Sequence, residues 1–286
     1  MRPSRHERAG VAGWDVASPR RPCRLPGVTM AGFGVRSLAV PVRMVPHPAV
    51  MLALDFGAGR ATVEDAAGRR RGSLVAGPGY GFGGAAFARG TEVECVQVRL
   101  SPLIARAVLG VSLAELRDAT VDADDLLGHR ETERIRARLA ELPSWQARFG
   151  LLDAWLARRY APGTAVAAEV AWAWRRIVAV RGAVRVDRLA AEVGWSRRRM
   201  WSRFGAQLGL TPKRAATLVR FDHAAHRLVA GHAAARVAAD VGYADQSHLH
   251  REVRAFAGGT PAGLADEPFL AIDDVAWPGQ RVSVRW

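Results

Sequence analysis

One pattern of residues occurs twice in the C-terminal third of this 286-residue sequence, and it constrains the fold more than any other feature. Each copy places a short apolar helix, a glycine turn and a second apolar helix in that order, which is the helix-turn-helix plan. Ser196 and Asp245 stand where the two second helices begin, and they predict N-caps there. The corresponding pairs lie roughly fifty residues apart and are Gly194/Gly242, Trp195/Tyr243, Met200/Leu249 and Pro212/Pro261.

The residues between the two copies predict one long helix, because Leu218, Phe221 and Ala225 recur at helical spacing. Such a helix would hold the two units rigidly, so that their second helices enter successive faces of the major groove about 34 Å apart. Glycine turns separate the helical runs, and no strand pattern interrupts them. We therefore predict an all-helical domain over residues 164–266, followed by a C-terminal tail over 267–286.

The N-terminal half follows a different pattern, with short β-rich runs broken by glycine and proline. The runs are VRSLAV, AVMLAL, ATVED, GSLVAG and VECVQVRL. Short strands without helices between them favour a small antiparallel barrel or sandwich, which we place within residues 31–110. Residues 1–30 carry six arginines, several prolines and no periodicity. We expect a flexible basic tail there, and Met30 is an alternative start of translation.

Helical spacing resumes after Ser101-Pro102 and continues to the break at Ala161-Pro162-Gly163. Ser112 with Glu115 three residues later predicts a capping box that opens one of these helices. We assign residues 111–163 to a helical linker. Its large apolar residues have two interpretations, a seam between two copies of the chain or packing of the linker onto either domain. They include Leu139, Leu142, Leu152 and Trp155.

The excess positive charge gathers in the helical domain. The formal net charge is +14, and residues 170–266 carry 16 basic against 7 acidic side chains. A local positive excess is typical of a domain that binds a polyanion. A solvated basic surface is the alternative. The whole sequence prefers arginine, with 40 arginines and one lysine, Lys213. A high arginine content therefore does not by itself indicate a polyanion-binding domain.

Residues 183–264 resemble the DNA-binding domain of AraC/XylS-type transcriptional regulators. The run GYADQSHLHREVRAFAGGTP is close to the signature of that family, and SRRRMWSRFGAQLGLTPKR is similar to its first unit. Gly259 departs from the signature, which usually has an apolar residue there. Residues 33–101 and the helices that follow resemble the cupin-like sensory domain and linker of such regulators. The resemblance implies an α+β chain, with an antiparallel β domain, a helical linker and an all-α double helix-turn-helix domain.

The resemblance also implies that the second helix of each unit turns one face toward DNA bases. The base-reading residues would be Arg198, Trp201, Ser202, Gln246, Ser247, His250 and Arg251. Arginine can donate two hydrogen bonds to a guanine edge, and glutamine can pair with adenine. Trp201 has a second interpretation as a core residue between helices, and we interpret His248 as structural. Contacts to phosphate position a protein on DNA without reading its sequence. We assign them to Arg197, Arg199, Arg203 and Arg254.

No catalytic, metal or cofactor site is predicted. His47 is the one histidine of the β-rich region, and Cys23 and Cys95 lack the spacing of a zinc site. No apolar run approaches the roughly 18–20 residues of a membrane span, and we expect a cytoplasmic, bacterial protein without membrane association. Its partners would be double-stranded DNA, RNA polymerase, a small-molecule effector of unknown identity and a second copy of the chain. The alternative function is a helical module for protein interaction or nonspecific nucleic-acid binding that has lost operator specificity.

Overall fold

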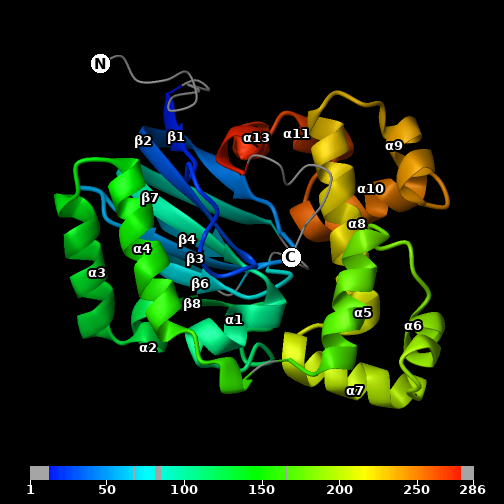
Figure 1. The fold of residues 1–286 in the computed structure, drawn as a ribbon. Helices are drawn as coiled ribbons and strands as arrows, with labels where there is room; N and C mark the ends of the chain where they lie inside the picture. Colours follow the sequence, from blue (N-terminus) through cyan, green and yellow to red (C-terminus); the bar gives the residue numbers. More distant parts are fainter. Residues whose placement is uncertain (1–12, 67, 81–84, 165, 278–286) are drawn as a thin grey trace.

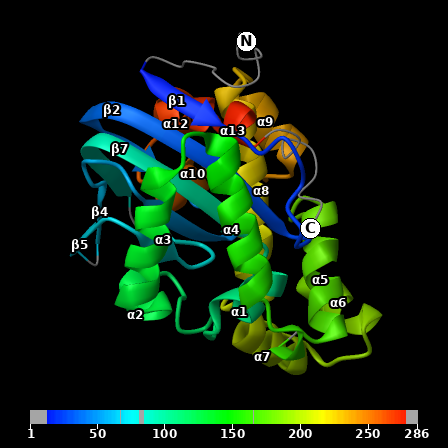
Figure 2. The same ribbon diagram turned by 60° about the vertical axis from the view of Figure 1, so that its left-hand side comes forward.

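The computed structural model describes residues 13–66, 68–80, 85–164 and 166–277. These residues form a β-rich part and a helical part that lie side by side (Figure 1). The linker helices cover the face of the sheet that is turned away from the helical part (Figures 1 and 2). The fold class is the predicted one, an antiparallel β domain with a helical linker followed by an all-α domain.

The β-rich part is an eight-stranded antiparallel sheet. Its strands are β1 (Trp14–Ala17), β2 (Val28–Met44), β3 (Val50–Asp55), β4 (Thr62–Asp65), β5 (Gly68–Arg71), β6 (Leu74–Ala76), β7 (Ala86–Leu100) and β8 (Thr120–Asp122). The order is β1-β2-β7-β3-β6-β8, and β4 pairs with both β7 and β5. The long pair of β2 and β7 is its centre and carries an irregularity between Leu38 and Val42.

The structure changes two expectations about the N-terminal half. Residues 14–17 and 28–30 belong to strands rather than to a tail, because Val16, Val28 and Met30 are buried in the sheet. Residues 1–12, the rest of the expected tail before β1, lie outside the described residues. Residues 113–118 form successive turns, and residues 112–118 contain no helix.

Tertiary contacts account for the turns in residues 112–118. This segment is pressed against the helical part so closely that a Cβ atom on Gly209 would lie 2.2 Å from the carbonyl oxygen of Leu113. Arg117 Nε also donates a hydrogen bond of 2.7 Å to the carbonyl oxygen of Gly209. The capping box therefore does not open a helix here, since contacts between distant residues set the backbone instead.

The linker helices pack on one face of the sheet. They are α1 (Pro102–Leu109), α2 (Ala123–Leu127), α3 (His129–Glu141) and α4 (Trp145–Arg159). Leu139, Leu152 and Trp155 are buried in the cluster that these helices share with the strands. Of the two interpretations of these residues, packing onto the N-terminal domain is therefore the correct one. Leu142 is half-buried at the end of α3.

The helical part has its own core. Its elements are η1 (Pro162–Thr164), α5 (Ala168–Ala179), α6 (Val186–Glu192), α7 (Arg197–Leu208), α8 (Pro212–Val229), α9 (Ala234–Val241), α10 (Gln246–Ala257) and α11 (Pro261–Ala265). Trp174, Phe204, Phe221 and Phe256 are fully buried at its centre. Gly182, with φ +78°, lies against α8 so closely that a Cβ atom would come within 2.1 Å of a backbone oxygen.

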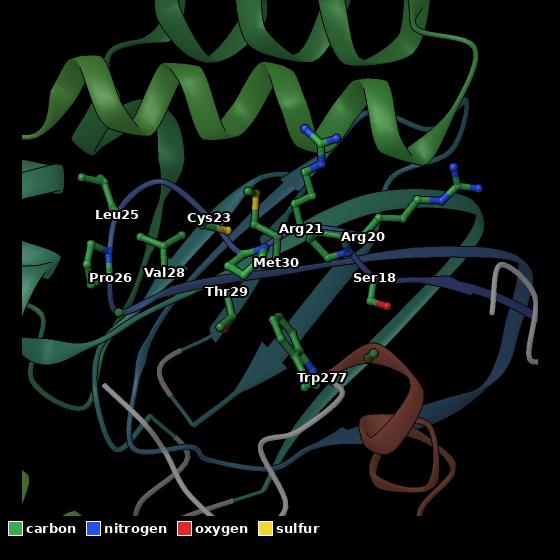
Figure 3. Close-up of a pocket in the computed structure, with 14 residues that line it drawn as sticks. Ser18, Arg20, Arg21, Cys23, Leu25, Pro26, Val28, Thr29, Met30 and Trp277 are labelled. Atoms are coloured by element: carbon green, nitrogen blue, oxygen red, sulfur yellow. The ribbon is translucent and has the colours of Figure 1, made fainter.

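Residues 267–277, which we call the C-terminal segment, are structured although they were expected to be part of a tail. They form α12 (Pro268–Ala271) and α13 (Asp273–Ala276). Phe269, Ile272 and Trp277 are buried in the cluster on the second face of the sheet, opposite the linker helices. Trp277 also lines a groove of about 430 Å³ beside residues 18–30 (Figure 3). The sheet is thus covered on both faces, and the last described residues of the chain cover one of them.

Candidate nucleic-acid interface

The two helix-turn-helix units share the same turn geometry. Gly194 and Gly242 both adopt left-handed backbone angles, with φ +66° and +84°. The aromatic residue after each glycine donates its backbone N–H five residues back, Trp195 to Ala190 and Tyr243 to Ala238, at 2.9 Å in both units. Left-handed φ with this hydrogen bond is the usual way to close a helix at glycine. The duplication seen in the sequence is therefore a duplication of structure.

The second helix of each unit begins at a side-chain cap. Ser196 Oγ accepts a hydrogen bond of 3.2 Å from the backbone N–H of Arg199. Asp245 Oδ1 accepts one of 2.6 Å from the backbone N–H of His248. Each cap satisfies an amide that would otherwise lack a partner in the first turn. The caps thus fix where α7 and α10 start.

The outward face of α7 is basic and largely free of internal contacts. Arg198, Ser202 and Arg203 are exposed, and within the described residues they make no hydrogen bond or ion pair through their side chains. Arg197 instead lies 3.5 Å from Asp187, at the start of the first unit. The guanidinium of Arg199 lies 4.7 Å from the ring centre of Trp195. Arg199 and Arg197 are therefore partly engaged with their own unit, whereas Arg198 and Arg203 are available to a ligand.

Trp201 has features of both predicted roles, a reader of DNA bases and a core residue between helices. Its side chain is half-buried. The indole N–H is inaccessible to solvent and has no hydrogen-bond partner among the described residues. The ring therefore packs as a core residue on the side of its N–H, while the rest of it remains partly accessible.

The outward face of α10 carries four exposed side chains that match the predicted base-reading set. They are Gln246, Ser247, His250 and Arg251. Gln246 Nε2 lies 3.4 Å from His250 Nε2, one turn further along. Arg254 is exposed near the C-terminal end of the same helix. The polar groups on this face thus offer both donors and acceptors to a ligand.

His248 has internal partners on its own unit. Its ring meets the ring of Tyr243 edge to face at 5.2 Å, and its Nε2 lies 3.4 Å from Glu252 Oε1. Glu252 also pairs with Arg220 of α8, whose guanidinium lies 4.7 Å from the ring centre of Tyr243. Burial is the main cause that raises the pKa of Tyr243 above its ordinary value. This cluster fastens the turn of the second unit to α8.

Arg220 and Glu252 position α10 without facing outward, and they are not among the site residues predicted from the sequence. Helical spacing could have indicated part of the cluster, since Glu252 follows His248 by four residues on one face. The contact with Arg220 lies 32 residues away in the sequence, beyond any local pattern. Phe221, next to Arg220, stacks on Phe256 of α10 with ring centres 4.6 Å apart. α8 therefore holds α10, the second helix of this unit, by an aromatic contact and an ion pair together.

One comparison with known proteins identifies the kind of domain. Residues 189–266 match a family model described as a helix-turn-helix domain. No curated protein matches the sequence. None of the described helices is long and apolar enough to span a membrane. The described ranges also contain no group of three or more His, Cys, Asp or Glu residues suited to a metal ion.

Several solved structures are similar to this chain at low identity. A variant of apo ToxT from Vibrio cholerae strain SCE256 is 8% identical with a TM-score of 0.48, over 86% of this chain and 99% of that one. The C-terminal domain of AraT, a response regulator from Geobacillus stearothermophilus, is 18% identical with a TM-score of 0.33, over 35% and 85%. The AraC-like transcriptional activator CuxR is 15% identical with a TM-score of 0.27, over 67% and 79%.

Proposed function

We propose that this chain, a DNA-binding transcriptional regulator with a helix-turn-helix domain of the AraC type at residues 189–266, reads its operator with two recognition helices, α7 and α10. The observation that carries the proposal is the repeated unit. Both units have the same glycine turn and a capped second helix, and one continuous helix, α8, joins them. A rigid connection between two such helices suits two successive major-groove faces on one side of B-DNA.

The proposal divides the exposed residues into two roles. Readers of base edges are Arg198, Trp201, Ser202, Gln246, Ser247, His250 and Arg251. Residues that contact phosphate are Arg197, Arg199, Arg203 and Arg254. Among the described residues, the exposed guanidinium groups of Arg198 and Arg251 have no internal partner. This supports their assignment as readers, because a bidentate contact to guanine needs an arginine that is not already engaged.

The sheet supports a sensory role for the N-terminal domain. Its second face encloses an apolar pocket that we propose as the place of a small-molecule effector, with Trp14, Phe33 and Tyr80 among its lining residues. We also propose RNA polymerase and a second copy of the chain as partners. No catalytic step is part of the proposal, and we expect the protein to act in the cytoplasm, where bacterial operators lie.

Selection of bound duplexes from a random pool, at near-physiological salt, tests the proposal. Two enriched blocks about one helical turn apart, roughly 34 Å, are expected from two recognition helices. Binding that depends steeply on salt without enrichment would instead support the alternative, a nonspecific nucleic-acid-binding module.

Two variants test whether α7 is responsible for one of the two enriched blocks. Arg198→Ala should remove the enrichment of one block and leave the other. Arg138→Ala is the matched control, because it removes the same charge from an exposed position of α3, on the opposite side of the sheet. If both variants changed the selected sequences equally, α7 would not be a reader of bases.

A further inference from the structure

The C-terminal segment (residues 267–277) belongs to two domains at once. It follows α11 of the helical part directly, yet most of its buried side chains lie in the sheet. Leu270 is buried in the core of the helical part, whereas its neighbour Phe269 is buried in the cluster of the sheet. One short helix, α12, is therefore shared between the two cores.

Phe269 occupies the apolar pocket on the second face of the sheet. Its ring centre lies 5.4 Å from that of Phe33 and 6.0 Å from that of Trp14. With Phe269 in place, a cavity of about 60 Å³ remains. Two water molecules fill that volume, whereas a cavity of about 150 Å³ can hold benzene. The chain's own aromatic ring thus takes the place that a ligand of similar size would need.

The pocket is not fully matched to this ring. Gln97 lines the cavity and is 5% exposed, and its Oε1 has no hydrogen-bond partner among the described residues. Phenylalanine offers no donor to it, and a buried acceptor without a partner is unfavourable. A ring that carries one hydrogen-bond donor would satisfy Gln97 as well as fill the pocket.

A charged cluster fastens the segment at the domain boundary. Asp273, which is 3% exposed, accepts a hydrogen bond of 3.1 Å from Arg99 of β7 and lies 3.0 Å from His226 Nε2 of α8. His47, from the loop between β2 and β3, lies 2.8 Å from Asp222 of α8. The same guanidinium of Arg99 lies over the ring of Trp277. Three parts of the chain therefore meet at Asp273.

The end of the second recognition helix is fastened nearby. Arg43 of β2 donates to Glu267 at 2.8 Å and also to the carbonyl oxygen of Ala257, the last residue of α10. A Cβ atom on Gly258 would lie 2.7 Å from Ala85 Cβ. Movement of the C-terminal segment would thus release contacts that hold α8 and α10 against the sheet.

We propose that the C-terminal segment is a releasable plug. Its Phe269 ring is an intramolecular occupant of the pocket, and an aromatic molecule with one hydrogen-bond donor competes for that place. When such a molecule enters, Phe269 leaves, the contacts of Asp273 break, and the helical part is freed from the sheet. This inference rests on the effector pocket proposed above and adds the chemistry of its ligand. Its test does not require DNA binding, so a failure of the plug and a failure of operator recognition can be told apart.

Hydrogen exchange measured by mass spectrometry on the full chain, with and without phenol, tests the plug. Phenol has a ring of the right size and one O–H donor. It is expected to speed exchange in residues 267–277 and at the C-terminal end of α10, while the linker helices α3 and α4 stay unchanged. Toluene, which lacks the donor, should bind more weakly than phenol. Phe269→Ala should bind phenol at least about tenfold more tightly than the wild type, because no ring has to leave first.

Two more conservative variants provide the same test in case Phe269→Ala does not fold. Phe269→Leu and Phe149→Leu make the same change on opposite faces of the sheet, and both phenylalanines are buried. Only Phe269→Leu is expected to bind phenol more tightly than the wild type. Equal phenol affinity of the two variants would overturn the proposal. Unchanged or slower exchange of residues 267–277 in the wild type at saturating phenol would overturn it as well.

Discussion

Replacing His226 should change how the stability of the chain depends on pH. His226 lies on α8 between two carboxylates, 3.0 Å from Asp273 and 3.9 Å from Asp222. Burial lowers the pKa of this histidine, but the two carboxylates outweigh burial and raise it to about 9 from the ordinary 6.5. The folded chain therefore holds a proton on His226 that the unfolded chain gives up at a lower pH.

The sign and size of the effect follow from this difference. Because the folded pKa is the higher one, the contribution of His226 is complete below pH 6.5 and is lost as the pH rises through about 9. The difference between the folded and the ordinary pKa of His226 corresponds to a contribution of about 3 kcal/mol at most to the free energy of unfolding. Burial, with Arg99 in second place, lowers the pKa of His47, and burial, with Arg181 in second place, lowers that of His223 to about 4. Those two histidines therefore change charge below about pH 7.5 in either state.

The measurement is the free energy of unfolding in urea at pH 7.5 and pH 9.5. The wild type should lose about 2 kcal/mol more than His226→Gln between these values. Other groups that titrate in this range, such as the cysteine thiols of the unfolded chain, act equally on both proteins and cancel in the difference. An equal loss in both proteins would refute the assignment of a protonated His226 between the carboxylates.

Three further predictions concern the recognition helices and their support. Arg251→Ala should relax the sequence preference in one half-site. Arg203→Ala should lower the affinity for all duplexes alike and reduce the slope of affinity against salt by about one. Identical losses of affinity by both variants on every sequence would contradict the division into base readers and phosphate contacts. Asp245→Ala should cost about 1 kcal/mol in thermal unfolding, because the first turn of α10 loses its cap, and Asp245→Asn should retain most of it. Gly182→Ala should destabilise the chain in urea by about 1 kcal/mol or more, because φ there is +78° and Ala216 O blocks a Cβ atom; an unchanged midpoint would show that the turn can move.

The sequence predicted the helical domain closely because its signals are local. Glycine turns, caps and apolar spacing all act within a few residues, and Gly194, Ser196, Gly242 and Asp245 have the geometry that these signals indicated. The strand runs were also correct, since each of them falls in a strand or overlaps one.

The errors came from contacts between distant parts of the chain. Residues 112–118 contain the residues of a capping box, yet they form turns that pack closely against Gly209 instead of a helix. The C-terminal segment consists of two helices of four residues each, which are too short to show a helical period. Arg220 and Asp273 act through partners on other elements, so nothing in their own neighbourhood indicated their part in the site.

The position of the C-terminal segment also affects how the chain folds during synthesis. The second face of the sheet receives its cover from Phe269, about 170 residues after the last residue of β7 has been made. At about 5–20 residues per second, the ribosome needs roughly 10–35 seconds for that stretch. The nascent sheet therefore lacks the cover of Phe269 for that time, and we expect its apolar second face to be prone to aggregation until residue 269 has been made. A stop codon just before residue 267 should give a protein that aggregates even though both recognition helices are present.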